Sequence, residues 1–261
     1  MELLLTFQNT QRTLIPIDYQ YYLSSWIYNI LSKGDEKYAT FLHDQGYKAA
    51  SRGKIFKLFS FSRLFFEYDQ NRDRTALIVK SPELTMKARF KVDAAIEGFI
   101  KGLFQDQILR LKNGYNSMAS FEVKTVETRG IKIDTDHATI RATSPIVISL
   151  KTADGKEEYL SPTHSEYEQL FLTNLFDKYL ASGDNIKPEW QSISTSFKLL
   201  YPDRIKSKLV TIKSESKQET RVRGWLFDFE IVAPREVIEI GLLGGFGKEC
   251  GMGFGFGELI A

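Results

Sequence analysis

The sequence contains one cysteine, three histidines and no long hydrophobic run. Because Cys250 is alone, it can form no internal disulfide, and a cysteine-rich zinc site is excluded. No window approaches the roughly 20 apolar residues that span a membrane, and the N-terminal MELLLTF is too short for a signal peptide. We therefore expect a soluble, cytoplasmic protein with no membrane partner.

Charge is nearly balanced over the chain, with a formal net charge of +2, but it is unevenly distributed. Residues 198–223 hold eight basic and three acidic side chains. This local excess indicates a polyanion-binding surface, although a solvated hairpin with ordinary surface lysines has the same pattern. The candidates for this surface are Arg204, Lys206, Lys208, Arg221 and Arg223.

The spacing of apolar residues predicts a similar order of elements in each half of the chain. In the first half, helices at 18–33 and 93–109 alternate with strand-like runs, the longest of which is 54–68. In the second half, a strand at 139–150 precedes a helix at 161–181, and further strands follow. The economical interpretation is two α+β domains.

Glycine is concentrated near the C-terminus, where residues 241–257 hold eight of the chain's 18 glycines. No register of this stretch fits the dinucleotide-binding G-x-G-x-x-G pattern. A P-loop requires serine or threonine after its glycine and lysine, but Glu249 follows Gly247 and Lys248. Both phosphate-binding fingerprints are therefore excluded.

The same stretch does not resemble a flexible tail. Flexible linkers combine glycine with serine, whereas this stretch combines it with Phe246, Phe254 and Phe256. If these rings are anchored in the core, the glycines between them leave bare backbone facing outward, where amides can bind phosphate oxygens. A purely structural role in close packing is the alternative.

Several motifs occur together in one order along most of the chain. They are YQYYLSSWIYNIL, FLHDQGY, KLFSFSRL and SPIV, followed by G-F-G, five residues and G-F-G at 245–255. In combination they resemble the CRISPR-associated endoribonucleases that cut precursor CRISPR RNA within its repeats. The resemblance implies two tandem ferredoxin-like domains, which we place at 1–126, with the catalytic residues, and at 138–261, with the basic hairpin and the glycine loop.

RNA can be cut without a metal because its own 2′-hydroxyl is a nucleophile next to the scissile phosphate. The enzyme must align this hydroxyl, move one proton off it, deliver another to the departing 5′-oxygen and stabilise the phosphorane charge. We therefore expect no metal and no other cofactor. The expected partner is CRISPR repeat RNA, and a CRISPR effector complex and a second copy of the chain remain open as further partners.

Histidine suits the proton transfers because its ordinary pKa lies near neutrality. His137 lies in the polar run DTDHA, where Asp134 and Asp136 make a metal site a weak alternative, and His164 lies near a helix start. His43 falls off the apolar stripe of a short helix that ends near Gly46. The residues alone favour an ordinary surface histidine, but the resemblance implies that His43 is catalytic.

Tyr28 also points away from the apolar stripe of its helix. A large aromatic there is either an interface residue or a functional hydroxyl, and the resemblance implies the second. For the third catalytic residue, the resemblance favours Lys57, with Lys54 and Lys48 as competitors. In an extended strand Lys54 and Lys57 would face opposite sides, so that only one of them could serve.

We thus predict a metal-independent endoribonuclease whose products carry 2′,3′-cyclic phosphate and 5′-hydroxyl ends. His43 and Tyr28 share the proton transfers, with the assignment of base and acid left open, and Lys57 stabilises the phosphorane. The rivals are a non-catalytic RNA-binding subunit of a CRISPR ribonucleoprotein and a generic RNA-recognition module. Besides the basic hairpin, the residues expected to hold RNA are Gly245, Gly247, Lys248, Gly253 and Gly255.

Overall fold

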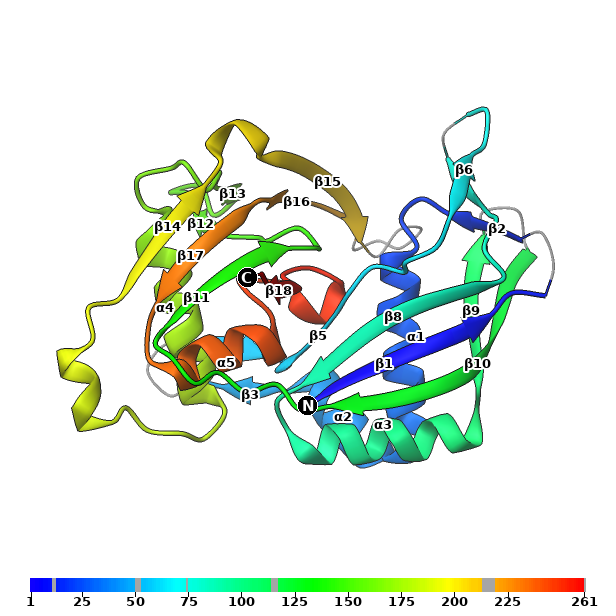
Figure 1. The fold of residues 1–261 in the computed structure, drawn as a ribbon, viewed down its shortest axis with the longest axis horizontal. Helices are drawn as coiled ribbons and strands as arrows, with labels where there is room; N and C mark the ends of the chain where they lie inside the picture. Colours follow the sequence, from blue (N-terminus) through cyan, green and yellow to red (C-terminus); the bar gives the residue numbers. More distant parts are fainter. Residues whose placement is uncertain (11–12, 50–52, 74, 114–116, 213–218, 261) are drawn as a thin grey trace.

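Two α+β halves lie side by side, and the last part of the chain returns between them (Figure 1). No helix in the described part of the chain is long and apolar enough to cross a membrane. The computed structural model describes residues 1–10, 13–49, 53–73, 75–113, 117–212 and 219–260.

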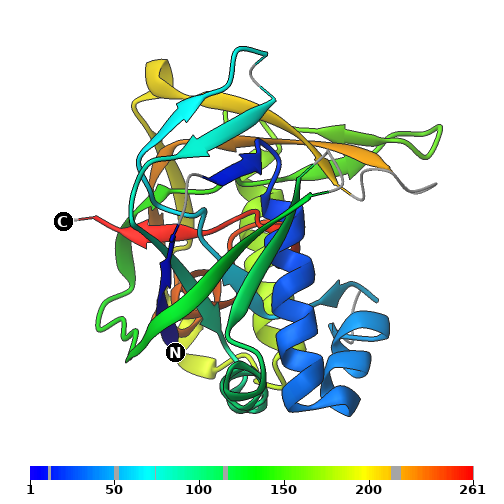
Figure 2. The same ribbon diagram turned by 90° about the vertical axis from the view of Figure 1, so that its right-hand side faces the viewer.

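The N-terminal half is built on a five-stranded antiparallel sheet with the order β5-β8-β1-β10-β9. Helices α1 (Gln20–Gly34) and α3 (Asp93–Gln105) cover one face of this sheet (Figure 2). Alternate residues of β1 are fully buried in the core that includes these helices, and Phe7 meets Trp26 of α1 edge to face. The strands are β1 (Glu2–Gln8), β5 (Phe59–Phe61), β8 (Glu83–Phe90), β9 (Ile108–Asn113) and β10 (Ser117–Arg129).

The C-terminal half has a four-stranded antiparallel sheet with the order β14-β17-β11-β18. Helices α4 (Tyr167–Ala181) and α5 (Arg235–Gly244) pack with this sheet in a second core rich in phenylalanine. An additional antiparallel hairpin, β15 (Lys206–Ile212) and β16 (Thr220–Leu226), extends from this half (Figure 1). The sheet strands are β11 (His137–Ala142), β14 (Ser196–Leu200), β17 (Asp228–Val232) and β18 (Gly257–Leu259).

Each half follows the order strand, helix, strand, strand, helix, strand, if the additional short elements are set aside. In both sheets the first of these strands lies between the third and the fourth. This is the ferredoxin-like arrangement, so the predicted fold class of two tandem ferredoxin-like units is confirmed. The boundaries 1–126 and 138–261 stay a prediction; β10 ends at Arg129 and β11 begins at His137.

Shorter elements decorate the two halves. A second helix, α2 (Glu36–Asp44), directly follows α1, and the side chain of Asp35 caps it by accepting a hydrogen bond from the Tyr38 amide. The other short elements are β2 (Thr13–Pro16), β3 (Tyr47–Lys48), β4 (Ile55–Phe56), β6 (Tyr68–Gln70), β7 (Ala76–Val79), β12 (Ser149–Lys151), β13 (Glu157–Tyr159) and the 3₁₀ turns η1 (Pro188–Ser192), η2 (Pro202–Arg204) and η3 (Cys250–Met252).

The continuous strand predicted for residues 54–68 is wrong. The segment contains β4, β5 and the first residue of β6, and the chain turns sharply between β4 and β5, where Leu58 adopts a left-handed conformation with φ of 53°. Because β4 covers only Ile55–Phe56, neither Lys54 nor Lys57 lies within a strand, and strand alternation does not decide between them. Both line the same cleft, where Lys54 reaches Asp177 and Lys57 reaches the His43 carbonyl.

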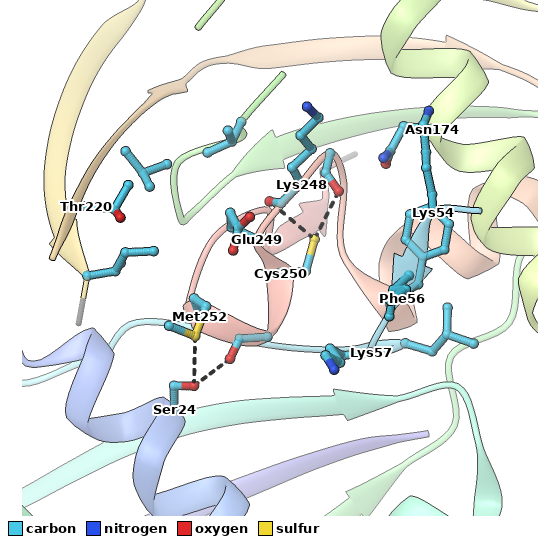
Figure 3. A pocket seen from close by; sticks show the side chains of 18 of the residues that line it. Ser24, Lys54, Phe56, Lys57, Asn174, Thr220, Lys248, Glu249, Cys250 and Met252 are labelled. Atoms are coloured by element: carbon cyan, nitrogen blue, oxygen red, sulfur yellow. Dashed lines mark hydrogen bonds between the residues drawn. The ribbon is translucent and has the colours of Figure 1, made fainter. Parts of the chain in front are cut away.

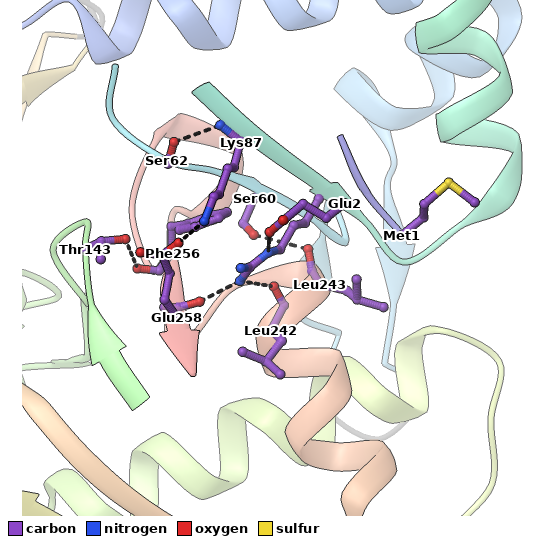
Figure 4. A network of polar contacts seen from close by, with 12 residues as sticks. Met1, Glu2, Ser60, Ser62, Lys87, Thr143, Leu242, Leu243, Phe256 and Glu258 are labelled. Atoms are coloured by element: carbon purple, nitrogen blue, oxygen red, sulfur yellow. Dashed lines mark hydrogen bonds and ion pairs between the residues drawn. The ribbon is translucent and has the colours of Figure 1, made fainter. Parts of the chain in front are cut away.

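A network of polar contacts that includes Glu2, Leu242 and Glu258 joins the two halves (Figure 4). Arg89 of β8 is 5% exposed, and its Nε donates to the Glu2 carboxylate at 2.7 Å. Its Nη1 donates to the carbonyl oxygens of Leu242 at 3.3 Å and Gly257 at 2.5 Å, while its guanidinium lies 4.1 Å from the ring centre of Phe256. Arg89 therefore holds the segments on both sides of the glycine loop against the N-terminal sheet.

Candidate active site

An open cleft with a volume of about 1010 Å³ lies between the halves. The N-terminal half contributes α1, the end of α2 and the segment around β4. The C-terminal half contributes α4, the β15–β16 hairpin and the glycine loop, defined here as residues 245–256. The cleft contains Tyr28, His43 and Lys57, so the structure brings the three predicted catalytic residues to one place.

Tyr28 and His43 come from neighbouring helices and meet edge to face. Their ring centroids are 5.9 Å apart, and the Tyr28 ring also packs against Phe59 at 5.6 Å. The His43 side chain is 75% exposed, and its Nδ1 lies 2.8 Å from a carboxylate oxygen of Asp44. As the helical phase predicted, His43 lies off the buried face of its helix. Its imidazole lines the cleft and packs against the ring of Tyr28.

The hydroxyl of Tyr28 makes no hydrogen bond to any residue in the described part of the chain. Burial, together with the negative charge of Glu249, raises the pKa of Tyr28 far above the usual 10.0 of tyrosine. The phenol therefore keeps its proton at neutral pH, which suits it to donating a hydrogen bond rather than to accepting a proton.

The Lys57 ammonium lies at the C-terminal end of α2, where it donates to the carbonyl oxygens of Leu42 and, at 2.7 Å, of His43. Cations are favoured there because the last helical carbonyls lack partners. Burial lowers the pKa of Lys57, and the charges of Asp44 and Glu249 oppose this shift. Lys57 thus places a positive charge beside the backbone that carries His43.

The two competing lysines have different surroundings. Lys54 forms an ion pair of 2.9 Å with Asp177 of α4, whose side chain is only 5% exposed. Lys48 is exposed on β3 and is not among the residues that line the cleft. Of the three lysines, only Lys57 contacts the peptide of His43.

The glycines of the loop are buried, so the expectation that they face outward is wrong for Gly245, Gly247, Gly253 and Gly255. All four have positive φ values, between 71° and 93°. A Cβ on Gly247 would lie 2.4 Å from the Val147 carbonyl oxygen. Close packing thus explains the glycines, and Gly247 is the one of these four that also lines the cleft.

Side chains from both halves hold the carbonyl groups of the loop. From α1, Ser24 Oγ donates to the Gly251 carbonyl at 2.6 Å and Gln20 Nε2 to that of Gly253 at 3.2 Å. From α4, the buried Lys178 ammonium donates to the carbonyls of Gly245 and, at 2.7 Å, Gly247. Sequence reasoning missed these three side chains because nothing in their local pattern marks them as partners of a distant loop.

Lys248 and Glu249 are the charged residues of the loop (Figure 3). The Lys248 ammonium donates to Ser149 Oγ at 2.6 Å and to the Glu157 carboxylate at 3.2 Å. Burial opposes ionisation of Glu157, yet hydrogen bonding from Ser149 and the charge of Lys248 leave its pKa below the usual value. A phosphate that approached Lys248 would therefore compete with this carboxylate.

The basic residues predicted on the hairpin are all exposed, but they do not form one surface. The strand register places Lys206 and Lys208 on the face that carries Val222, which lines the cleft. Arg221 and Arg223 fall on the opposite face, since side chains alternate along a strand. Arg204 lies in the turn before the hairpin, 4.9 Å from the ring centre of Tyr201.

Lys206 and Lys208, on the cleft side of the hairpin, have a basic neighbour, Arg63, that the sequence did not indicate. Although Lys208 as a residue is exposed, partial burial of its ammonium lowers its pKa, and the charges of Arg63 and Lys206 lower it further. Arg63 belongs to the N-terminal half, so positive charge from both halves meets beside the cleft. Lys213 and Lys217, which contributed to the predicted basic segment, lie outside the described residues.

Comparisons with known proteins agree with this architecture. The family described as CRISPR-associated protein Cas6, N-terminal, matches residues 14–126, and that described as CRISPR associated protein Cas6, C-terminal, matches residues 124–259. A Methanocaldococcus jannaschii protein named CRISPR-associated endoribonuclease Cas6 1 is 28% identical over 262 residues, which is 98% of this chain and 91% of the relative. The Pyrococcus furiosus CRISPR-associated endoribonuclease Cas6 is 22% identical, over 92% of this chain and 82% of the relative.

Solved structures show the same fold. A structure described as CRISPR associated protein Cas6 superposes with a TM-score of 0.73 at 24% identity, covering 100% of this chain and 99% of that one. A Cas6-related protein from Pyrococcus furiosus gives a TM-score of 0.80 at 17% identity, with coverage of 100% and 98%. Since the C-terminal family match alone spans more than half of the sequence, the chain belongs to the CRISPR-associated Cas6 family.

Proposed function

We propose that the cleft cuts CRISPR repeat RNA by attack of a ribose 2′-hydroxyl on the adjacent phosphate, with Tyr28, His43 and Lys57 as the catalytic residues. As a member of the Cas6 family, the chain is a CRISPR-associated endoribonuclease. One observation carries the assignment of residues: the edge-to-face contact of Tyr28 and His43, at 5.9 Å, in a cleft lined by both halves and by Lys57.

The surroundings of each group favour particular roles. His43 accepts the proton of the 2′-hydroxyl as the new oxygen–phosphorus bond forms, since imidazole exchanges protons near neutrality. Tyr28, whose pKa is raised by burial, keeps its proton and donates it toward the departing 5′-oxygen as the old bond breaks. Lys57 stabilises the additional negative charge of the phosphorane. The products are a 2′,3′-cyclic phosphate and a 5′-hydroxyl.

RNA is held by the cleft-lining part of the glycine loop and by the basic residues around it. Gly247 and Lys248 line the cleft, whereas Gly245, Gly253 and Gly255 support RNA binding indirectly, because their close packing fixes the shape of the loop. Lys206 and Lys208 extend the surface on the cleft side of the hairpin, and Arg204, Arg221 and Arg223 hold the backbone of RNA that passes around its other face. We expect these contacts to weaken with salt, as phosphate contacts do.

The proposal is tested by single-turnover cleavage of the repeat RNA in EDTA, beside an RNA with one 2′-deoxy sugar immediately upstream of the cut. We expect full cleavage of the first RNA and none of the second. A requirement for magnesium, or cleavage of the deoxy RNA, would contradict the mechanism. Tight binding without any product would instead favour a non-catalytic RNA-binding subunit.

Three wider points belong to the same proposal. The enzyme works in the cytoplasm and hands its product to a CRISPR effector complex. A homodimer is the oligomeric form to look for, by light scattering with and without RNA. The domain boundaries 1–126 and 138–261 can be examined by limited proteolysis, which should cut between them.

A further inference from the structure

One buried polar group in the cleft has no partner in the part of the chain that the structure describes. Asn174, on α4, is 4% exposed and lines the cleft, yet its Oδ1 accepts no hydrogen bond from any residue that the structure describes. Leaving such a group unpaired costs about 1–3 kcal/mol, and the great majority of buried polar atoms in proteins are paired. The arrangement is explained if the amide is paired when a ligand occupies the cleft.

The neighbours of Asn174 already have partners. One helical turn further along α4, the Lys178 ammonium uses its three protons on the Gly245 and Gly247 carbonyls and, at 3.2 Å, on Cys250 Sγ. Lys54 pairs with Asp177 at 2.9 Å, and the Lys248 ammonium is bonded to Ser149 and Glu157. The group left to be satisfied here is therefore an amide, not a cation.

This chemistry selects the kind of ligand. A phosphodiester offers only acceptor oxygens, so it cannot satisfy the Oδ1 of Asn174. A nucleobase offers N–H donors beside acceptors, and a side-chain amide matches such an edge with two hydrogen bonds. Phe56, which is 8% exposed, lines the cleft from β4 and lies next to α4 through the Lys54–Asp177 pair, so it gives this part of the cleft an apolar wall against which a base can pack (Figure 3).

We propose that Asn174 reads one nucleobase of the bound repeat RNA, which leaves the strand and enters the cleft beside Phe56. The inference rests on the proposed RNA-cleaving function and adds a position at which the enzyme senses sequence, apart from the residues that carry out the chemistry. Because Asn174 Oδ1 has no partner in the described part of the chain, pairing it with a base breaks no hydrogen bond to a described residue.

The test measures the binding of repeat RNAs that each carry one abasic site, moved along the repeat, to wild-type protein and to Asn174→Ala. We expect the wild type to lose affinity about tenfold at one position, in the range of a two-bond base contact. Asn174→Ala should bind the intact repeat about tenfold more weakly and lose nothing further at that position, while it responds normally at all others. The ribose is retained in every RNA, so a 2′-hydroxyl contact would leave no such signature.

Asn185→Ala is the matched control, because this asparagine is exposed in the same half and does not line the cleft. An identical abasic profile for wild type and Asn174→Ala would overturn the proposal. The proposal would also be overturned if Asn174→Ala lowered the affinity equally for every abasic RNA and changed its salt dependence. That result would mean that Asn174 contacts the phosphate backbone of the RNA. A wild type that binds but does not cut would refute the proposed chemistry and leave this coupling measurable, whereas one that does not bind the repeat would overturn both.

Discussion

Replacing Tyr28 with phenylalanine should separate catalysis from stability. The substitution keeps the ring, which packs against His43 at 5.9 Å and Phe59 at 5.6 Å, and removes only a hydroxyl that bonds to no described residue. The free energy of unfolding should therefore change by no more than about 0.5 kcal/mol, as for other substitutions that break no contact. If the phenol transfers a proton, its loss slows the chemical step about 10²–10⁴-fold.

The assay combines single-turnover cleavage of labelled repeat RNA at saturating enzyme with thermal unfolding of the free protein. Tyr68→Phe is the control, because this tyrosine is 46% exposed on β6 and is not among the residues that line the cleft. A Tyr28→Phe rate within about threefold of wild type would refute the assignment, since general acid–base groups contribute far more. A large fall in melting temperature would show that the hydroxyl has a structural partner.

Four further substitutions test the site and its support. His43→Ala should slow cleavage about 10²–10³-fold in single-turnover assays and leave RNA affinity nearly unchanged in filter binding, because the 75% exposed side chain performs chemistry rather than packing; a matching loss of affinity would make it a binding residue. Lys57→Met should slow the reaction about 10²-fold, whereas Lys54→Met should mainly lower stability. Burial lowers the pKa of Lys57, and its positive charge is needed for the reaction. The wild-type rate should therefore fall as the pH rises through values below 10.5, the pKa of an ordinary lysine, and this fall should be absent in Lys57→Met. Arg89→Met should destabilise the fold by about 3–5 kcal/mol in urea titration, because the 6% exposed Glu2 loses its partner; an unchanged midpoint would contradict the role of this pair.

The sequence predicted the parts of the fold that depend on local periodicity. Apolar spacing alone indicated the similar order of elements in both halves, and the helical phase placed His43 off the buried face of its helix. The same reasoning pointed Tyr28 away from the core, whereas it is half-buried and packs against Phe59. The break between β4 and β5 was not predictable, because Leu58 has no local feature that marks its left-handed conformation. Turns of this kind are imposed by packing with other parts of the chain.

The missing parts of the site depend on contacts between distant residues. Lys54 and Lys57 look alike in sequence, and what distinguishes them is Asp177, 123 positions away from Lys54. The glycine loop was expected to face outward because its composition does not reveal that Val147, which packs against Gly247, comes from another segment. The burial of Asn174 was likewise not predictable, because nothing near it in the sequence indicates that its Oδ1 is buried without a partner among the described residues.

The hydrogen bonds from Arg89 to the carbonyls of Leu242 and Gly257 limit how far the two halves can move apart. Both stems of the glycine loop are tied to a strand of the opposite half, so the halves cannot swing apart without pulling the loop out of shape. The repeat RNA must therefore bind in a cleft whose width changes little. If the gene were split between the halves, nuclease activity would return only when the fragments re-formed this junction.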